Sequence, residues 1–216
     1  MLKQKRKITS NKKTFKYYIY YPNIIKKNMP VLVFLHGIGE RGNNLPDIEK
    51  YALPKYMNKF DIPYIVIVPQ CHENNFLDYH LRDVEKILEI EHEKFQFDKN
   101  NIFILGSSMG AYGAWNYLIQ RPNLFKGIIA VAGGIMLPLD QILLPIKDKA
   151  ILIYHGDNDN VINVKQSIIA CNKLKNIGAT NVELKIIKGD NHYLTSHAFK
   201  DEYLYKWLLK NTKGCY

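Results

Sequence analysis

A serine flanked by glycines, between an apolar run and an amphipathic stretch, restricts the fold of this chain more than any other feature. The segment reads Gly106-Ser107-Ser108-Met109-Gly110 and directly follows the apolar run 102–105. This GxSxG pattern is typical of a nucleophile elbow, a sharp turn between a strand and a helix that exposes a serine hydroxyl at the end of a sheet. The pattern therefore predicts a strand, a turn and a helix, with Ser108 in a strained backbone conformation at the turn.

Short apolar runs alternate with amphipathic stretches along the chain, which predicts an α/β fold with a mostly parallel sheet and helices on both of its faces. The predicted strands cover residues 15–20, 31–35, 64–68, 102–105, 127–131, 151–154 and 182–187. Helices are expected after Asp78, from Met109 to about Pro122, over 164–177, and around the apolar positions Phe199, Tyr203, Trp207 and Leu208.

The charge of the chain is +10, from 30 basic and 20 acidic residues. Four of the basic residues are Arg, the residue that reads phosphates and guanines best, so the composition argues against a nucleic-acid partner. Basic residues are dense near the start, and residues 1–14 are predicted to be a basic tail before a single domain at 15–216.

Two further patterns bear on the location of the protein. The chain has no apolar stretch as long as a secretory signal or a membrane span requires, so we expect no integral membrane association. The chain has three cysteines, an odd number, and they are widely spaced. This pattern does not indicate a disulfide framework and suits a reducing compartment. Both patterns favour a cytoplasmic protein.

A serine hydroxyl becomes a nucleophile when a base removes its proton, so Ser108 predicts an acid and a histidine farther along the chain. Two loops that follow predicted strands supply them. The first loop contains Asp157 and Asp159, and the second contains His192, with His197 shortly after it. We predict the catalytic set Ser108, Asp159 and His192. Asp157, which is better suited to capping its own turn, is the alternative acid, and His197 is the alternative base.

The tetrahedral intermediate of acyl transfer carries a negative charge that needs hydrogen-bond donors. The backbone N–H of Met109, which follows the nucleophile, is predicted as one donor. The loop after the strand 31–35 should supply the other, from Ile38, with Gly39 as the next choice. The remaining predicted pocket residues are Gly37, Gly39, Phe76, Met136 and Leu137.

Five segments together resemble the α/β-hydrolase superfamily: LHGIGERGNN (35–44), VPQC (68–71), GSSMG (106–110), HGDNDNVI (155–162) and GDNH (189–192). The resemblance covers about residues 15–210 and is closest to small serine esterases of the phospholipase/carboxylesterase and polyhydroxybutyrate-depolymerase-like groups, including feruloyl esterase-like proteins. It implies the same site residues, a small-molecule ester substrate, an acyl-enzyme intermediate, and no metal or organic cofactor. Because residues 133–149 are too few for a cap domain, we expect an open groove without a large lid.

Two alternatives remain. The same triad cleaves amides, and the loop at 35–42 is also similar to the catalytic domain of prolyl oligopeptidase, so a serine peptidase or amidase is the runner-up. A non-catalytic binding protein with the hydrolase fold is less favoured, because such proteins usually lose one of the three catalytic side chains and this chain keeps all three. The oligomeric state is left open.

Overall fold

The computed structural model describes residues 1–10, 13–59, 62–73, 81–136 and 139–212. Within them, eight strands form one sheet in the order β1-β2-β4-β3-β5-β6-β7-β8. The strands are β1 (Leu2–Ser10), β2 (Lys13–Tyr21), β3 (Val31–Leu35), β4 (Ile65–Pro69), β5 (Ile102–Ser107), β6 (Gly127–Val131), β7 (Ala150–Gly156) and β8 (Val182–Ile187). Strands β3 to β8 are parallel to one another, whereas the β1–β2 and β2–β4 pairs are antiparallel. The predicted mostly parallel sheet is confirmed.

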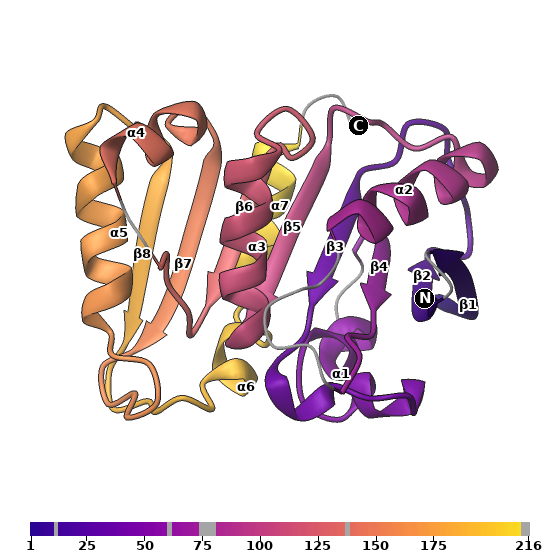
Figure 1. Ribbon diagram of the computed structural model, residues 1–216, viewed down its shortest axis with the longest axis horizontal. Coiled ribbons are helices and arrows are strands. Elements are labelled where there is room, and N and C mark those ends of the chain that lie inside the picture. The colour runs from indigo at the N-terminus through magenta and orange to yellow at the C-terminus, as the bar shows by residue number, and fades with distance from the viewer. Residues whose placement is uncertain (11–12, 60–61, 74–80, 137–138, 213–216) are drawn as a thin grey trace.

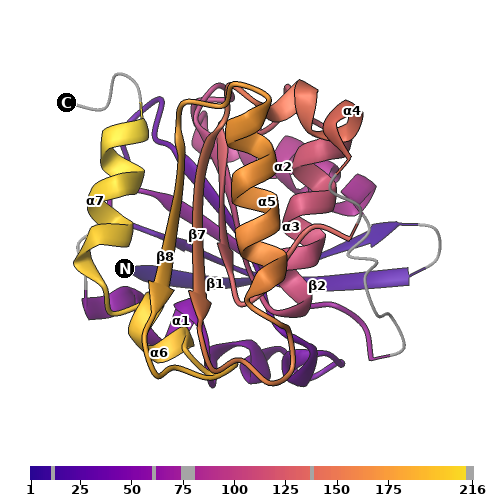
Figure 2. The same cartoon turned by 90° about the vertical axis from the view of Figure 1, so that its left-hand side faces the viewer.

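Helices cover both faces of this sheet (Figures 1 and 2). The helices α2 (Leu81–Phe95), α3 (Met109–Gln120) and α5 (Lys165–Asn176) lie on one face, and α7 (Glu202–Asn211) lies on the other. Short helical turns complete the described chain: η1 (Ile38–Glu40), η2 (Leu45–Glu49), α1 (Leu53–Tyr56), η3 (Met57–Lys59), α4 (Asp140–Leu143), η4 (Leu144–Ile146) and α6 (Thr195–Ala198).

The predicted last helix is divided, because Phe199 ends α6 and the Asp201 side chain then caps α7 by accepting the Tyr203 N–H at 2.9 Å. The cap predicted at Asp78 lies outside the described residues.

The core consists of two layers, one on each face of the sheet. Every residue of β3 is buried, and its alternate side chains point to opposite faces. Val31 and Val33 belong to the layer under α2 and α3, whereas Leu32 and Phe34 belong to the layer that also contains Trp207 of α7. Burial on both faces explains why the central strands are continuous apolar runs rather than alternating ones.

The predicted basic tail at residues 1–14 is corrected by the structure. Leu2–Ser10 form β1, which pairs with β2 over its whole length, from Leu2 opposite Tyr21 to Ser10 opposite Lys13. The strand is easy to miss because it lies at the sheet edge, where most of its side chains are exposed and polar, and because Ile8 is its one buried residue.

The described residues between β6 and β7 form α4 and η4 and no larger group of helices. None of the helices in the described part of the chain combines the length and apolar character needed to cross a membrane.

The assignment of β1 can be tested at Ile8, whose side chain is 6% exposed in the same core layer as Phe15. Ile8→Ala removes buried methyl and methylene groups, so we expect the free energy of unfolding in urea to fall by about 2 kcal/mol. Lys7→Ala is the matched control, because Lys7 is exposed on the same strand, and it should change stability by less than about 0.5 kcal/mol. Equal stability of the wild type and Ile8→Ala would contradict a packed strand and would favour the predicted tail at residues 1–14 instead.

Candidate active site

The turn between β5 and α3 holds Ser108 in the left-handed half of backbone space, with φ 54° and ψ −119°. Such a conformation persists where the surrounding contacts enforce it. A Cβ at position 106 would lie 2.0 Å from the Gly110 carbonyl oxygen, and a Cβ at position 110 would lie 2.0 Å from the Leu35 carbonyl oxygen. Both glycines are therefore required for the turn to lie against the end of β3, as the GxSxG pattern predicts.

The loops that carry the candidate residues all leave the sheet at one edge. Strands β3, β5, β7 and β8 run parallel, and the register pairs Leu35 with Gly106 and Gly156 with Ile187 near their carboxyl ends. This edge lies at the bottom of Figure 1, where α3 begins. In open α/β sheets, ligands bind at the carboxyl ends of the strands, so the topology alone brings the candidate residues together.

Ser108, His192 and Asp159 form a continuous hydrogen-bonded line. The His192 Nδ1 lies 2.8 Å from Asp159 Oδ2, and His192 Nε2 lies 2.8 Å from Ser108 Oγ. The Asp159 carboxylate can only accept a hydrogen bond, so His192 Nδ1 must be the donor and carries the proton of the neutral ring. His192 Nε2 is then free to accept the hydroxyl hydrogen of Ser108. This is the arrangement that a serine nucleophile needs for proton removal.

The acid side chain is fixed at both oxygens. Its Oδ1 accepts the N–H groups of Val161 at 2.9 Å and Ile162 at 2.8 Å, while Oδ2 faces His192. Burial alone would raise the pKa of Asp159, but the hydrogen bonds from Ile162, His192 and Val161 outweigh it and hold the pKa below its ordinary value. Asp159 is therefore an anion that can stabilise a cationic His192.

The alternative acid Asp157 and the alternative base His197 contact the loops that carry Asp159 and His192, and not Ser108. Asp157 Oδ1 accepts the Gly189 N–H at 2.7 Å, and the Asn158 N–H donates to the Asp190 carbonyl at 2.9 Å, so the acid loop and the histidine loop are joined. His197 is exposed and forms a hydrogen bond with the Asp190 side chain instead of approaching Ser108. Asp157 thus caps a neighbouring loop, not its own turn as expected from the sequence.

Ile38 and Met109, the residues predicted to supply the oxyanion donors, line the same cavity as Ser108. Met109 is the first residue of α3, and the N–H groups of a first helical turn have no partner within the helix. The loop after β3 approaches the serine closely, because a Cβ on Gly37 would lie 3.8 Å from Ser108 Cβ. Ile38 follows in this loop as the first residue of η1.

A buried histidine fixes the loop after β3. His36 Nε2 accepts the Cys71 N–H at 3.0 Å, so Nδ1 carries the proton and donates to the Gly37 carbonyl at 2.7 Å. Burial lowers the pKa of His36 to about 4, so the ring is neutral and this pattern is stable at neutral pH. His36 therefore has a structural role.

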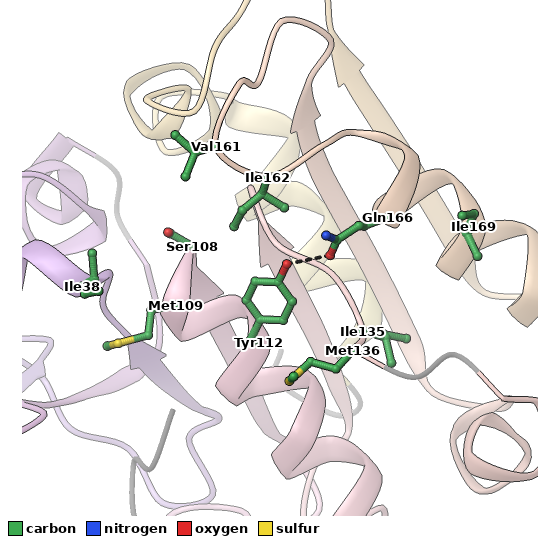
Figure 3. A pocket seen from close by; sticks show the side chains of 10 residues that line it. All are labelled: Ile38, Ser108, Met109, Tyr112, Ile135, Met136, Val161, Ile162, Gln166 and Ile169. Atoms are coloured by element: carbon green, nitrogen blue, oxygen red, sulfur yellow. Dashed lines mark hydrogen bonds between the residues drawn. The ribbon is translucent and has the colours of Figure 1, made fainter. Parts of the chain in front are cut away.

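A cavity of about 650 Å³ opens beside Ser108 between α3 and α5 (Figure 3). Of the ten described residues that line it, all but Ser108, Tyr112 and Gln166 are apolar. The predicted residues Ile38, Met109 and Met136 are among them. Gly37 and Gly39 are not lining residues of this cavity. Phe76 and Leu137 lie outside the described residues.

Sequence reasoning did not connect His155 with the site. The ring is fully buried, with Nε2 2.8 Å from the Ile162 carbonyl and 3.2 Å from Asp159 Oδ2. Its Nδ1 lies 2.7 Å from Ser167 Oγ on α5. His155 therefore contacts the loop that carries Asp159 from its buried side and holds it in place. The sequence signal was its place at the end of β7, four residues before Asp159.

Sequence reasoning also missed Tyr112 and Gln166, the polar residues of the cavity wall other than the serine. They belong to α3 and α5, where the helical pattern alone does not show which polar residues face a cavity. No cluster of three or more His, Cys, Asp or Glu side chains suited to a metal ion occurs within the described ranges.

The fold and this site define an α/β-hydrolase. Residues 60–208 match the family model described as Phospholipase/Carboxylesterase. The chain therefore belongs to the phospholipase/carboxylesterase family, and it is an enzyme of the carboxylic ester hydrolase class. The family and enzyme class inferred from the five sequence segments are confirmed.

Solved structures share the whole fold at low sequence identity. A thermostable esterase superposes with a TM-score of 0.84 at 24% identity, over 96% of this chain and 62% of its own, so the chain spans less than two thirds of that protein. The feruloyl esterase module from Clostridium thermocellum, in complex with sinapinate, gives a TM-score of 0.79 at 13% identity, over 100% of this chain and 90% of its own. Est1E from Butyrivibrio proteoclasticus gives 0.73 at 15% identity, over 96% and 98%.

The loop after β3 also contains a buried acid, Glu40. Its side chain Oε2 accepts the Gly37 N–H at 2.8 Å, while Oε1 is buried with no partner in the described part of the chain. Burial raises the pKa of Glu40 to about 7, although the Gly37 hydrogen bond opposes the shift. Glu40 therefore changes charge near neutral pH within the same loop as the predicted oxyanion donor Ile38.

This raised pKa predicts a pH-dependent stability. Glu40 binds its proton more tightly in the folded state than in the unfolded chain. Protonated Glu40 therefore contributes to the free energy of unfolding in full at low pH, and this contribution is lost as pH rises from about 4.5 to about 7. Between these limits the wild type should lose about 2 to 3 kcal/mol of unfolding free energy relative to Glu40→Gln, which keeps an acceptor for Gly37. Urea denaturation at a series of pH values measures the difference.

The control for this prediction is Glu89→Gln, which changes the net charge equally at an exposed position of α2. Its stability should follow that of the wild type across the pH range. A Glu40→Gln curve parallel to that of the wild type would contradict the raised pKa.

Proposed function

We propose that the protein is a serine carboxylesterase that hydrolyses carboxylic esters through an acyl-enzyme intermediate, with Ser108 as nucleophile, His192 as base and Asp159 as acid. The observation that carries the proposal is the line of two 2.8 Å contacts from Asp159 through His192 to Ser108. Membership of the phospholipase/carboxylesterase family supports the same reaction class.

In the first half-reaction, Ser108 Oγ attacks the ester carbonyl carbon while His192 Nε2 takes the hydroxyl proton. Asp159, an anion through its hydrogen bonds, stabilises the imidazolium that forms. The carbonyl π electrons move to oxygen, and the oxyanion accepts hydrogen bonds from the backbone N–H groups of Ile38 and Met109. When the carbonyl re-forms, the ester C–O bond breaks and the alcohol leaves with the proton from His192.

In the second half-reaction, water takes the place of the alcohol. His192 removes a proton from the water as it attacks the acyl carbon, the same backbone donors hold the oxyanion, and His192 then returns the proton to Ser108 Oγ. The carboxylic acid is released and the enzyme is regenerated. His192 carries each proton, and no atom changes its oxidation state in either half-reaction.

The apolar cavity beside Ser108 supports an uncharged ester substrate. Its described lining contains no acidic or basic side chain that could hold a charged arm. The same lining gives the peptidase alternative no carboxylate to hold a peptide amine. Cleavage of an aminoacyl anilide as fast as a nitrophenyl ester would nevertheless favour that alternative.

The nucleophile is tested with Ser108→Ala on nitrophenyl acetate, butyrate and octanoate and on a feruloyl ester. Loss of the only group that forms the acyl-enzyme should lower kcat by about 10⁴-fold or more, as for other serine hydrolases. Ser107→Ala is the matched control, since Ser107 is the buried neighbour at the end of β5 and should retain activity within a few-fold. Comparable activity in the wild type and Ser108→Ala would exclude the mechanism.

The acid is tested by replacing each of the two loop carboxylates. Asp159→Asn keeps the shape but no longer fixes the His192 tautomer, so kcat should fall by about 10³- to 10⁴-fold. Asp157→Asn preserves an oxygen for the Gly189 N–H and should change kcat by less than tenfold. A larger loss in Asp157→Asn than in Asp159→Asn would reassign the acid.

A further inference from the structure

The cavity beside Ser108 contains two polar side chains that the proposed mechanism does not use, Tyr112 and Gln166. The Tyr112 hydroxyl donates to Gln166 Oε1 at 2.6 Å, across the space between α3 and α5 (Figure 3). All other described lining residues apart from Ser108 are apolar. This pair is therefore the part of the wall that can recognise a polar atom of a ligand.

The position of the Gln166 amide is set by the backbone beside it. A Cβ on Gly134 would lie 2.7 Å from Gln166 Oε1 and 2.8 Å from Gln166 Cβ, so the side chain lies flat against this glycine. Burial raises the pKa of the Tyr112 hydroxyl although the Gln166 hydrogen bond opposes the shift, so Tyr112 stays a neutral donor. The pair therefore has a set position in the wall, although both side chains are half-buried rather than fully enclosed.

The Tyr112–Gln166 pair has donor hydrogens that its internal hydrogen bond does not use. Its internal bond uses the Tyr112 hydroxyl hydrogen and the Gln166 carbonyl oxygen, and the Gln166 NH₂ group has no partner among the residues that the structure describes. Turning the amide over would instead leave one amide hydrogen and the hydroxyl hydrogen unused. A ligand that fills the cavity displaces water from these donors, which costs free energy unless the ligand supplies an acceptor.

The pair also lines the same cavity as the reacting serine. Tyr112 is four residues after Ser108, the residue that precedes α3, and its N–H donates to the Ser108 carbonyl, so the Tyr112 backbone lies about 6 Å farther along the helix axis. An acceptor that reaches the pair would therefore be a few covalent bonds from the ester carbonyl at Ser108.

We propose that Tyr112 and Gln166 select esters whose arm in the cavity is apolar and uncharged but carries one neutral oxygen acceptor, an ether or carbonyl oxygen, a few bonds from the scissile ester. This inference rests on the proposed function and names the substrate class of the same site. A neutral hydrogen bond of this kind corresponds to about a 3- to 10-fold preference in kcat/KM.

The test compares matched esters that differ by one atom. In one series, nitrophenyl alkanoates are paired with analogues in which an ether oxygen replaces one methylene at successive positions of the acyl chain. In the other, acetate esters of alkyl and alkoxyalkyl alcohols place the oxygen in the alcohol arm, with acid release followed by titration. The quantity measured is the ratio of kcat/KM between each oxygen-containing ester and its hydrocarbon partner.

We expect this ratio to fall by about 3- to 10-fold at one oxygen position in one series in the double variant Gln166→Leu/Tyr112→Phe, which removes the amide donors and also the hydroxyl donor that Gln166→Leu alone would free. Gln166→Glu keeps the shape but replaces the spare donors by acceptors, so the same oxygen should become unfavourable relative to methylene. Gln120→Leu is the matched control, because Gln120 is an exposed residue near the end of α3 that does not line the cavity, and its ratios should equal those of the wild type.

The outcomes distinguish a failure of this inference from a failure of the proposed function on which it rests. Ratios unchanged in both Gln166 variants at every oxygen position would overturn the inference, while Ser108-dependent hydrolysis of the hydrocarbon esters would still support the proposed function. An absence of Ser108-dependent hydrolysis of any ester would overturn the proposed function and the inference with it.

Discussion

The close contact between the turn at Ser108 and the end of β3 is the constraint on which the site depends. Gly110 lies so near the Leu35 carbonyl that no side chain fits between them. The turn is held from other sides as well, because the Ser108 N–H donates to the Val131 carbonyl at 2.9 Å and the Ala111 N–H donates to the Ser108 carbonyl at 2.9 Å. These neighbours maintain a backbone conformation that an isolated serine would rarely adopt, and they bring the start of α3 beside the loop after β3.

The loops that carry Asp159 and His192 depend on a second close approach. A Cβ on Gly156 would lie 2.2 Å from the Asp190 carbonyl oxygen, so the end of β7 touches the histidine loop directly. Backbone hydrogen bonds and the Asp157 side chain join the same two loops. The orientation of His192 therefore depends on main-chain geometry as well as on its bond to Asp159, and His155 supports that geometry from the buried side.

The parts of the structure that could be predicted from the sequence are those with a local signal. The central strands are continuous apolar runs, and Ser108 lies in a motif whose spacing encodes its turn, so both were evident without coordinates. The two charged loops were also recognisable, and the structure brings Asp159 and His192 together with Ser108. Whether these three residues catalyse the reaction stays a prediction until the variants are measured.

Other parts have no local signal. Strand β1 is polar because it borders solvent, so its sequence is similar to that of a tail, and the antiparallel pairing with β2 is what defines it. Tyr112 and Gln166 are separated by 54 residues and become a pair through the packing of α3 and α5 on one face of the sheet.

The basic residues of β1 have a consequence for how the sheet ends. An edge strand offers unpaired N–H and C=O groups, on which a strand of another molecule can pair and begin aggregation. Lys5 and Lys7 are exposed along this edge. A second copy aligned on β1 would bring like ammonium groups close together, and their repulsion opposes such growth. The charge that makes the segment look like a tail thus protects the protein from edge-to-edge association.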